Sequence, residues 1–149
     1  MDDDIMNTNK INGSVSFQMN VTQGLEVTET KYDAQATLYK KEEKYFLFFD
    51  ETNFEDNSIT KCRFEIAQDT LRIRRDGQVI MDQTFKISES ITGYIKTIYG
   101  QLDTNAKTHR LSLDVFNDQL NLTLDYDLFV STERAGNYKL TVKFNKEDI

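Results

Sequence analysis

Three arginines fall within four positions of the segment LRIRRDGQVIMDQ, at Arg72, Arg74 and Arg75. A guanidinium carries a planar set of donors that matches a carboxylate or a phosphate, so this cluster is a candidate site for an anion. The same segment contains a turn signal, Asp76-Gly77, between two alternating apolar runs. The arginines therefore form either an anion-binding site or the solvent-exposed face of a hairpin.

The register of this hairpin decides where Arg72 and Arg74 point. A two-residue loop at Asp76-Gly77 would place both arginines opposite apolar side chains, whereas a three-residue loop pairs Arg74 with Gln78. In the second register one face holds Leu71, Ile73, Val79 and Met81, and the other holds Arg72, Arg74, Ile80 and Asp82. Because one face must be buried, we predict the second register, with the arginines in solvent and Asp82 paired with one of them. The alternative is an arginine cluster at the mouth of a barrel, holding a carboxylate or phosphate.

Two other residue types that often carry chemistry occur once each. His109 is the only histidine, and nothing near it in the sequence supplies a nucleophile or an orienting carboxylate. We predict an exposed strand histidine. Cys62 is the only cysteine and alternates with Phe64 and Ile66, which predicts a small apolar side chain in the core.

Asp125 and Asp127 form the one suggestive pair of carboxylates. Two positions along a strand separate Cα atoms by about 6.6–6.8 Å, a spacing that could serve a glycosidase or a cation site. The pair also continues a polar face begun by Asn121 and Thr123, so solvated acids explain it equally. Phosphate loops, paired zinc ligands and nucleophile elbows are missing from the sequence. We expect no enzyme and no cofactor.

Composition narrows the possible partners. The 149 residues carry a net charge of -7, which argues against a protein that binds nucleic acid by neutralising phosphates. The N-terminal MDDDIMNTNK has three acids where a signal peptide has basic residues, and no window contains eighteen consecutive apolar residues. A single cysteine suits a reducing compartment. We expect a cytoplasmic protein with neither a nucleic-acid nor a membrane partner.

The hydropathy pattern has a period of two almost throughout, which is typical of strands with one buried face. We predict strands over residues 13–22, 25–31, 33–40, 44–51, 59–67, 70–75, 78–86, 92–102, 108–116 and 119–131, with 137–145 as a further one. Turn-forming residues separate them at Gln23-Gly24, Lys40 to Glu43, Asn53 to Asn57, Asp76-Gly77, Asn117-Asp118 and Ala135-Gly136-Asn137.

Short turns between neighbours predict an all-β, antiparallel meander. Closing the meander removes both exposed edges and buries its apolar face, so we predict an up-and-down β-barrel of about eight to ten strands. A two-sheet sandwich is the alternative. We expect residues 1–10 to be a flexible segment and residues 11–149 to form a single domain.

A resemblance to a known family supports this fold. The pattern Arg75-x-Gly77-x-Val79-x-Met81-x-x-x-Phe85 is followed by Tyr94-x-x-Thr97-x-Tyr99-Gly100-x-Leu102, by Leu124-x-Tyr126-x-Leu128 and by NYKLTVKF, with FLFFDE earlier in the chain. Together they resemble the YwiB-like family of small bacterial proteins. The resemblance implies a lipocalin-like (calycin-type) barrel of unknown function, and a translation-related context because members are often encoded near an arginyl-tRNA synthetase.

Two departures limit the comparison with better-known barrels. Secreted lipocalins carry a Gly-x-Trp motif, and this chain has no tryptophan. Fatty-acid-binding proteins insert two helices between their first two strands, and here only Gln23-Gly24 lies between them. Lid-gated lipid transport is therefore not expected.

A closed barrel of this size can hold a small molecule, so our first hypothesis is a module that binds a small apolar or amphipathic ligand. The candidate ligand-binding residues are Arg75, Tyr94, Thr97, Tyr99, Tyr126 and Glu51, with Arg72 and Arg74 as candidate anion contacts. The tyrosines would supply aromatic walls, and Arg75 or Glu51 would lie at the rim. The alternative is a filled barrel whose surface binds another protein.

Overall fold

The computed structural model describes residues 9–147, and these residues form ten strands. The strands are β1 (Asn9–Gln23), β2 (Glu26–Lys41), β3 (Lys44–Asn53), β4 (Ser58–Ile66), β5 (Thr70–Asp76), β6 (Ile80–Lys86), β7 (Ser90–Thr97), β8 (Gly100–Phe116), β9 (Gln119–Val130) and β10 (Glu133–Lys146). Within residues 9–147 no helix is long and apolar enough to cross a membrane. The predicted flexible segment 1–10 falls mostly outside the described residues, and its last two residues belong to β1.

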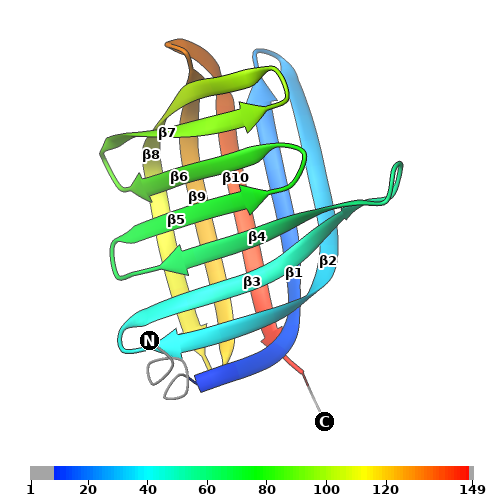
Figure 1. The fold of residues 1–149 in the computed structure, drawn as a ribbon. Helices are drawn as coiled ribbons and strands as arrows, with labels where there is room; N and C mark the ends of the chain where they lie inside the picture. Colours follow the sequence, from blue (N-terminus) through cyan, green and yellow to red (C-terminus); the bar gives the residue numbers. More distant parts are fainter. Residues whose placement is uncertain (1–8, 148–149) are drawn as a thin grey trace.

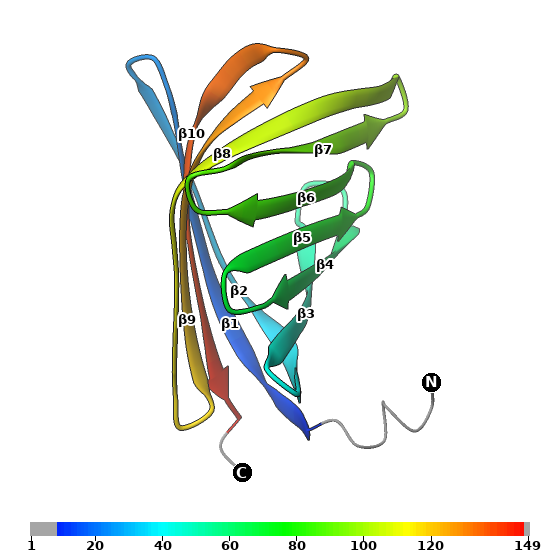
Figure 2. The ribbon, with the colours of Figure 1, turned by 90° about the vertical axis from the view of Figure 1, so that its left-hand side faces the viewer.

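The strands form one closed antiparallel barrel. Each strand pairs with the next, and β1 pairs with β10 to complete the ring. The long strands β8, β9, β10 and β1 run steeply along one side, and the shorter β3 to β7 cross them on the other (Figures 1 and 2). The predicted up-and-down barrel is confirmed, and the two-sheet alternative is wrong.

The alternation of direction gives the barrel two different ends. The hairpins β1–β2, β3–β4, β5–β6, β7–β8 and β9–β10 lie at one end, which we call the mouth end (Figure 1). The start of β1, the end of β10 and the other four hairpins lie at the opposite end (Figure 1).

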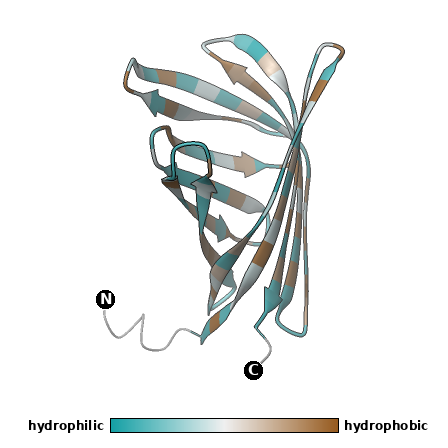
Figure 3. Cartoon of the chain, turned by 90° about the vertical axis from the view of Figure 1, so that its right-hand side faces the viewer, coloured by the Kyte–Doolittle hydropathy of each residue, from teal (hydrophilic) through white to brown (hydrophobic). Residues whose placement is uncertain are grey.

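Alternating side chains fill the barrel, as the period of two predicted. Apolar and polar positions succeed one another along each strand (Figure 3). The largest fully buried side chains are Phe64, Phe85, Phe144, Leu38, Leu47, Ile66, Leu71, Leu120, Leu122, Leu124, Leu140 and Gln83. Cys62 is 4% exposed and belongs to this core, which confirms the prediction that its thiol points inward.

Several strand boundaries differ from prediction. The predicted strands 25–31 and 33–40 are one strand, β2, and the predicted strand 92–102 is interrupted by a turn at Ile98-Tyr99. The signal for that turn was Gly100, whose φ of 125° is readily adopted only by glycine. The predicted turn at Ala135-Gly136-Asn137 is instead a β-bulge in β10, and the chain turns earlier, at Ser131-Thr132.

The Ser131-Thr132 turn escaped prediction because its residue types are unusual for its geometry. Both residues have positive φ, 49° and 73°, which is the backbone of a two-residue type I′ hairpin turn. Asparagine, aspartate and glycine usually occupy these positions.

The arginine hairpin has the predicted faces but not the predicted register. Arg74 pairs with Asp82 rather than with Gln78, and Arg75 pairs with Met81. The two registers differ by an even number of residues, so each side chain stays on the same face. The hydrophobic pattern could therefore predict the faces without fixing the loop length.

The ladder between β6 and β7 is short, and a buried glutamine takes its place. Only Ile80 to Asp82 pair with β7, so the two strands separate beyond Asp82. Gln83 lies in this gap, 2% exposed, and donates through Nε2 to the carbonyls of Ile91 at 2.8 Å and Thr84 at 3.0 Å. Its Oε1 accepts from Thr104 Oγ1 at 2.6 Å.

Gly93 makes the approach of this glutamine possible. A Cβ atom at Gly93 would lie 2.4 Å from the carbonyl oxygen of Asp82 and 2.6 Å from Oε1 of Gln83. Any side chain at this position would therefore push β7 away from β6.

Candidate functional site

An ion pair lies inside the barrel near its mouth. Arg75 follows the buried Leu71 and Ile73 on the inward face of β5, and Glu51 follows Leu47 and Phe49 on that of β3. The Nη2 atom of Arg75 donates to Oε2 of Glu51. Their side chains are 40% and 23% exposed, so the pair lies at the boundary between the apolar interior and water. Charges in such a position are uncommon in a core and require an explanation.

Burial and neighbouring charges act together on the groups around this pair. Burial alone would lower the pKa of Arg75, but the neighbouring groups, chiefly the carboxylate of Glu51, together raise it by more, so the guanidinium remains charged. Burial raises the pKa of the Cys62 thiol, despite the opposing effect of Arg75. The thiol is therefore held in its neutral form, which is the less reactive one.

A tyrosine beside this pair has an unpartnered hydroxyl. Tyr32 stacks on Phe17 with ring centroids 4.6 Å apart. Its hydroxyl oxygen is buried and has no hydrogen-bond partner among the described residues. Burial, followed by the charge of Glu51, raises the pKa of Tyr32, so the group is a neutral donor. Buried hydroxyls normally have a partner, which makes this one a candidate contact for a ligand.

A cavity of about 220 Å³ lies in the barrel next to the ion pair. It is lined by Phe17, Met19, Cys62, Phe64, Ile73, Arg75, Val79, Met81, Ile95, Tyr126, Leu128, Tyr138 and Leu140. Tyr126 and Tyr138 stack on each other in this wall, with ring centroids 5.2 Å apart. Arg75 is the one charged side chain in the lining, and Val79 is 46% exposed at the mouth end. The site is thus an apolar chamber with a guanidinium near its entrance.

The structure brings together three of the six residues that the sequence suggested for ligand binding. Arg75 and Tyr126 line the cavity, and Glu51 contacts Arg75. The expectation that Tyr94 and Tyr99 line the interior is wrong. Tyr94 pairs with the outward-facing Asp82, and Tyr99 is 93% exposed in the β7–β8 turn.

Thr97 also lies away from the cavity. Its Oγ1 accepts from the backbone N–H of Tyr99 at 3.1 Å and so supports the β7–β8 turn. Residues that the sequence analysis missed are Phe17, Met19, Tyr32 and Tyr138. Alternation predicted the inward direction of Phe17, Met19 and Tyr138, but not that they would meet at one height in the barrel, and Tyr32 fell between two predicted strands.

Arg72 and Arg74 lie on the outer face of the barrel, as the hairpin interpretation predicted. Arg72 donates to both carboxylate oxygens of Asp82, at 3.0 Å from Nε and 2.7 Å from Nη2. Arg74 is more distant, with 3.9 Å between its Nε and Oδ2 of Asp82. The hydrogen bonds from Arg72, together with the charges of both arginines, outweigh burial and lower the pKa of Asp82.

This ion pair gives the barrel a measurable acid sensitivity. Asp82 has a lower pKa in the folded state than its unfolded value of about 3.9, so it stabilises the fold above that pH and loses this contribution as pH falls through the folded pKa. We expect Asp82→Asn to lower the free energy of unfolding by about 1 kcal/mol at pH 7. The deficit should shrink steadily below pH ~4. Urea denaturation at several pH values measures this.

Asp33 provides the matched control, since it is exposed on β2. Asp33→Asn should change the stability little at any pH. A deficit in Asp82→Asn that stays constant down to pH ~2 would show that the ion pair does not cause it.

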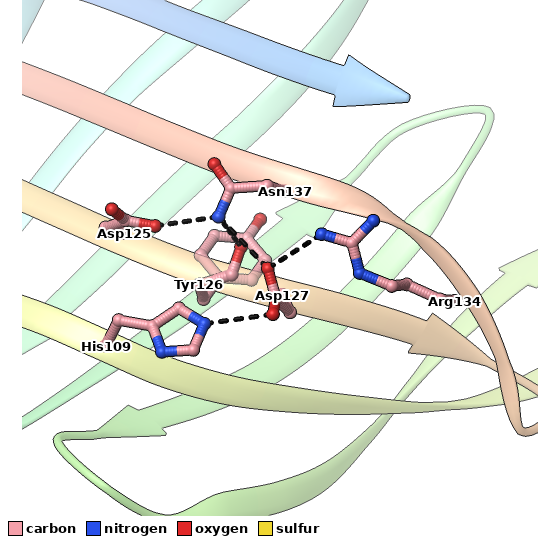
Figure 4. A network of polar contacts seen from close by, with 6 residues as sticks. All are labelled: His109, Asp125, Tyr126, Asp127, Arg134 and Asn137. Atoms are coloured by element: carbon pink, nitrogen blue, oxygen red, sulfur yellow. Dashed lines mark hydrogen bonds and ion pairs between the residues drawn. The ribbon is translucent and has the colours of Figure 1, made fainter. Parts of the chain in front are cut away.

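A second polar cluster lies on the outer face of β8, β9 and β10. It confirms that His109 is an exposed strand histidine but adds a partner that the sequence did not reveal. Nε2 of His109 lies 3.0 Å from Oδ2 of Asp127, whose other oxygen is 3.2 Å from Nη2 of Arg134 (Figure 4). An orienting carboxylate is therefore present. It comes from the adjacent strand, through a β-bulge between Thr108 and Arg110 that sequence spacing does not reveal.

Asn137 ties the two aspartates of this cluster together. Its Nδ2 donates to Asp125 at 2.8 Å and to Asp127 at 3.0 Å (Figure 4). Burial raises the pKa of Asp127. The hydrogen bonds from Asn137 and His109 and the charge of Arg134 together lower it by a larger amount, so the net shift is downward. Each carboxylate is thus already occupied by donors from its own sheet. Within residues 9–147 no three His, Cys, Asp or Glu side chains are placed to hold a metal ion.

The cluster forms no enclosed site. His109 is 42% exposed, and the adjoining groove, about 290 Å³, is on the outer surface beside Arg110 and Lys139. A larger groove of about 850 Å³ lies over β7, β8 and β9 and is lined mostly by polar side chains such as Thr92, Asp103 and Asn105. It is open to solvent, whereas the smaller interior cavity can enclose an apolar group. The interior cavity is therefore the stronger candidate site.

Comparison with known proteins agrees with the fold and leaves the function open. The uncharacterized beta-barrel protein YwiB of Bacillus subtilis (strain 168) is 23% identical over 108 residues, which cover 71% of this chain and 73% of that protein. The crystal structure of ywiB protein from Bacillus subtilis matches with a TM-score of 0.82 at 16% identity, covering 93% of this chain and 94% of that one. The resemblance to the YwiB-like family is thus confirmed.

A family model gives the assignment itself. The model described as Domain of unknown function (DUF1934) matches residues 15–142, which is most of the chain. Because that match covers most of the chain, this chain belongs to the DUF1934 family.

Proposed function

We propose that this protein binds a small amphipathic carboxylate, with a single ring or a short branched chain, inside the mouth end of the barrel. The observation that carries the proposal is Arg75, a charged guanidinium in the wall of an otherwise mainly apolar cavity. The role is binding rather than catalysis. The nearby Cys62 supports this, because its buried thiol is held in the neutral form. We place the activity in the cytoplasm, where a single unpaired cysteine stays reduced.

The size of the cavity favours a small ligand. A volume of about 220 Å³ is larger than a cavity of roughly 150 Å³ that binds benzene. It therefore has room for one ring and a short substituent. Haem and long-chain fatty acids are too large to be enclosed.

The guanidinium supplies the specificity for a carboxylate. Arg75 has five N–H donors in a fixed planar arrangement, and its hydrogen bond to Glu51 uses Nη2. A ligand carboxylate that took the place of Glu51 would still balance the charge of Arg75 in the interior. The side chain of Glu51, near the mouth, would rotate toward the solvent. The hydroxyl of Tyr32 is a further donor beside the pair.

Aromatic and sulfur-containing side chains would hold the apolar part. Phe17, Tyr126 and Tyr138 supply ring faces in the wall, and Met19 and Met81 adapt readily to irregular ligand shapes. We infer that these five residues contact the ring of the ligand.

Isothermal titration with benzoate tests the proposal, with benzyl alcohol as a ligand of similar size that lacks the charge. A ligand of nine non-hydrogen atoms should bind with a Kd of about 0.1–1 mM. Arg75→Leu should weaken binding by about 10- to 100-fold, since a charge-assisted hydrogen bond contributes about 1.5–3 kcal/mol. Arg74→Leu removes a neighbouring charge on the outer face and should leave the affinity unchanged.

The outcomes separate a specific site from general attraction to positive charge. Equal weakening by Arg75→Leu and Arg74→Leu would mean that benzoate binds outside the barrel. Equal affinity for benzoate and benzyl alcohol would show that the guanidinium of Arg75 does not bind the ligand's carboxylate.

A further inference from the structure

The mouth end of the barrel carries an exposed apolar surface. Four of its five hairpins have large apolar side chains at or beside the turn, and these are Leu25, Phe54, Val79, Ile98 and Tyr99 (Figure 1). We call these five residues the mouth rim. Leu25 is 106% exposed, Phe54 85%, Ile98 87% and Tyr99 93%.

The turns at the opposite end have a different character. They contain Glu42-Glu43, Gln68-Asp69 and Asn117-Asp118, which is the usual polar chemistry of turns. Exposed apolar residues do occur there singly, at Ile87 and Phe116, but only the mouth end has them on four neighbouring hairpins. Exposed apolar side chains on four successive turns around one opening favour a contact with another molecule.

The charges around the mouth rim indicate which kind of molecule. The mouth-end turns and the residues beside them carry five acidic side chains, Glu26, Glu55, Asp56, Asp76 and Glu133. The cations equally near these turns are Arg134, which is paired with Asp127, Arg75, which is paired with Glu51, and the exposed Lys96, so acidic side chains remain in excess. This surface would be repelled by an anionic bilayer and by a second copy of itself, in a chain whose net charge is -7.

We infer that the mouth rim is the docking surface for a protein partner that presents apolar side chains within a basic surface. The rim would supply the apolar contacts, with Phe54 and Tyr99 as aromatic anchors of the kind enriched at protein interfaces. The acidic residues between them would attract the partner and favour its correct orientation. Val79 belongs to both the mouth rim and the cavity lining, but the other four rim residues lie outside the cavity, so the inference does not depend on what the cavity binds.

A synthetic amphipathic helix of leucine and lysine, 17 residues long, serves as the test probe. We expect it to bind the intact protein in 50 mM salt and to bind at least tenfold more weakly in 300 mM salt. A double variant, Phe54→Ser with Ile98→Ser, should reduce the affinity at least tenfold, because it removes two rim contacts from exposed turns. The matched control is Phe116→Ser, which removes an exposed phenylalanine at the opposite end and should change nothing.

Five results would overturn the inference. The first is an absence of peptide binding, and the second is equal binding by the rim variant and the control. Equally strong binding of a leucine–glutamate helix would refute the charge argument. Co-sedimentation with phosphatidylcholine–phosphatidylglycerol vesicles, or dimerisation abolished by the rim variant, would assign the surface to a bilayer or to a second copy.

Discussion

Replacing Gln83 with leucine should lower the free energy of unfolding by about 3 kcal/mol. Gln83 is a buried polar side chain in a wall of apolar ones, and its amide replaces the ladder where β6 and β7 separate. Leucine would leave Thr104 Oγ1 and the carbonyl of Ile91 without this partner. Each unsatisfied buried group costs about 1–3 kcal/mol. Urea denaturation measures the difference.

The control for this prediction is Gln78→Leu. Gln78 is exposed in the β5–β6 loop and makes one long hydrogen bond, 3.3 Å, to Asp56. Its loss should change the stability by less than about 0.5 kcal/mol. A similar small effect for Gln83→Leu would mean that the barrel closes between β6 and β7 without help from this side chain.

The second large effect concerns Glu51, whose removal should tighten the binding of benzoate by about tenfold. In the free protein Glu51 occupies Arg75, so a ligand carboxylate must compete with it. Their attraction amounts to a few kcal/mol at an effective dielectric constant of about 20, and partial exposure reduces it to about 1.4 kcal/mol. Glu51→Gln removes the competing charge while keeping the size of the side chain.

Arg75→Leu and Glu51→Gln should therefore change affinity in opposite directions. A pair that only supported the barrel would behave differently, because losing either partner would damage the same structure. Titration calorimetry of both variants with benzoate, at a temperature well below the Tm of each, distinguishes the two cases. Weaker binding by Glu51→Gln would contradict the proposed exchange of carboxylates.

Much of the fold could be predicted from the sequence because burial on a strand has a period of two. The pattern Leu120, Leu122, Leu124 and Tyr126 assigned the inward face of β9 correctly, and all four are buried. The same argument assigned Cys62 to the core and Arg72 to the outside. A face is a local property, so nearby residues suffice to define it.

Register and turn position depend on more distant residues. The arginine hairpin kept its faces under a shift of register, because the shift is even and the pattern is insensitive to it. The bulge at His109 and the positive φ angles at Ser131 and Thr132 are set by neighbouring strands. These features were therefore missed.

The candidate site shows the same division. Alternation places Arg75 on the inward face with Ile73, so its direction was implicit in the sequence. Its meeting with Glu51 depends on how β3, β4 and β5 align across three strands. Tyr94 and Tyr99 were suggested as aromatic walls from residue type alone, and their positions in an outer face and a turn could not be read from type.

The most direct test uses the methionines, since two of the four, Met19 and Met81, line the cavity and the others, Met1 and Met6, lie outside the described residues. Met19→Leu and Met81→Leu would assign the two signals in a spectrum of protein labelled with ¹³C at the methionine methyl groups. Titration with benzoate should shift both signals saturably through the ring current, and Arg75→Leu should require about 10- to 100-fold more benzoate for the same shifts. Unchanged Met19 and Met81 signals at saturating benzoate would contradict the claim that the barrel interior holds the ligand.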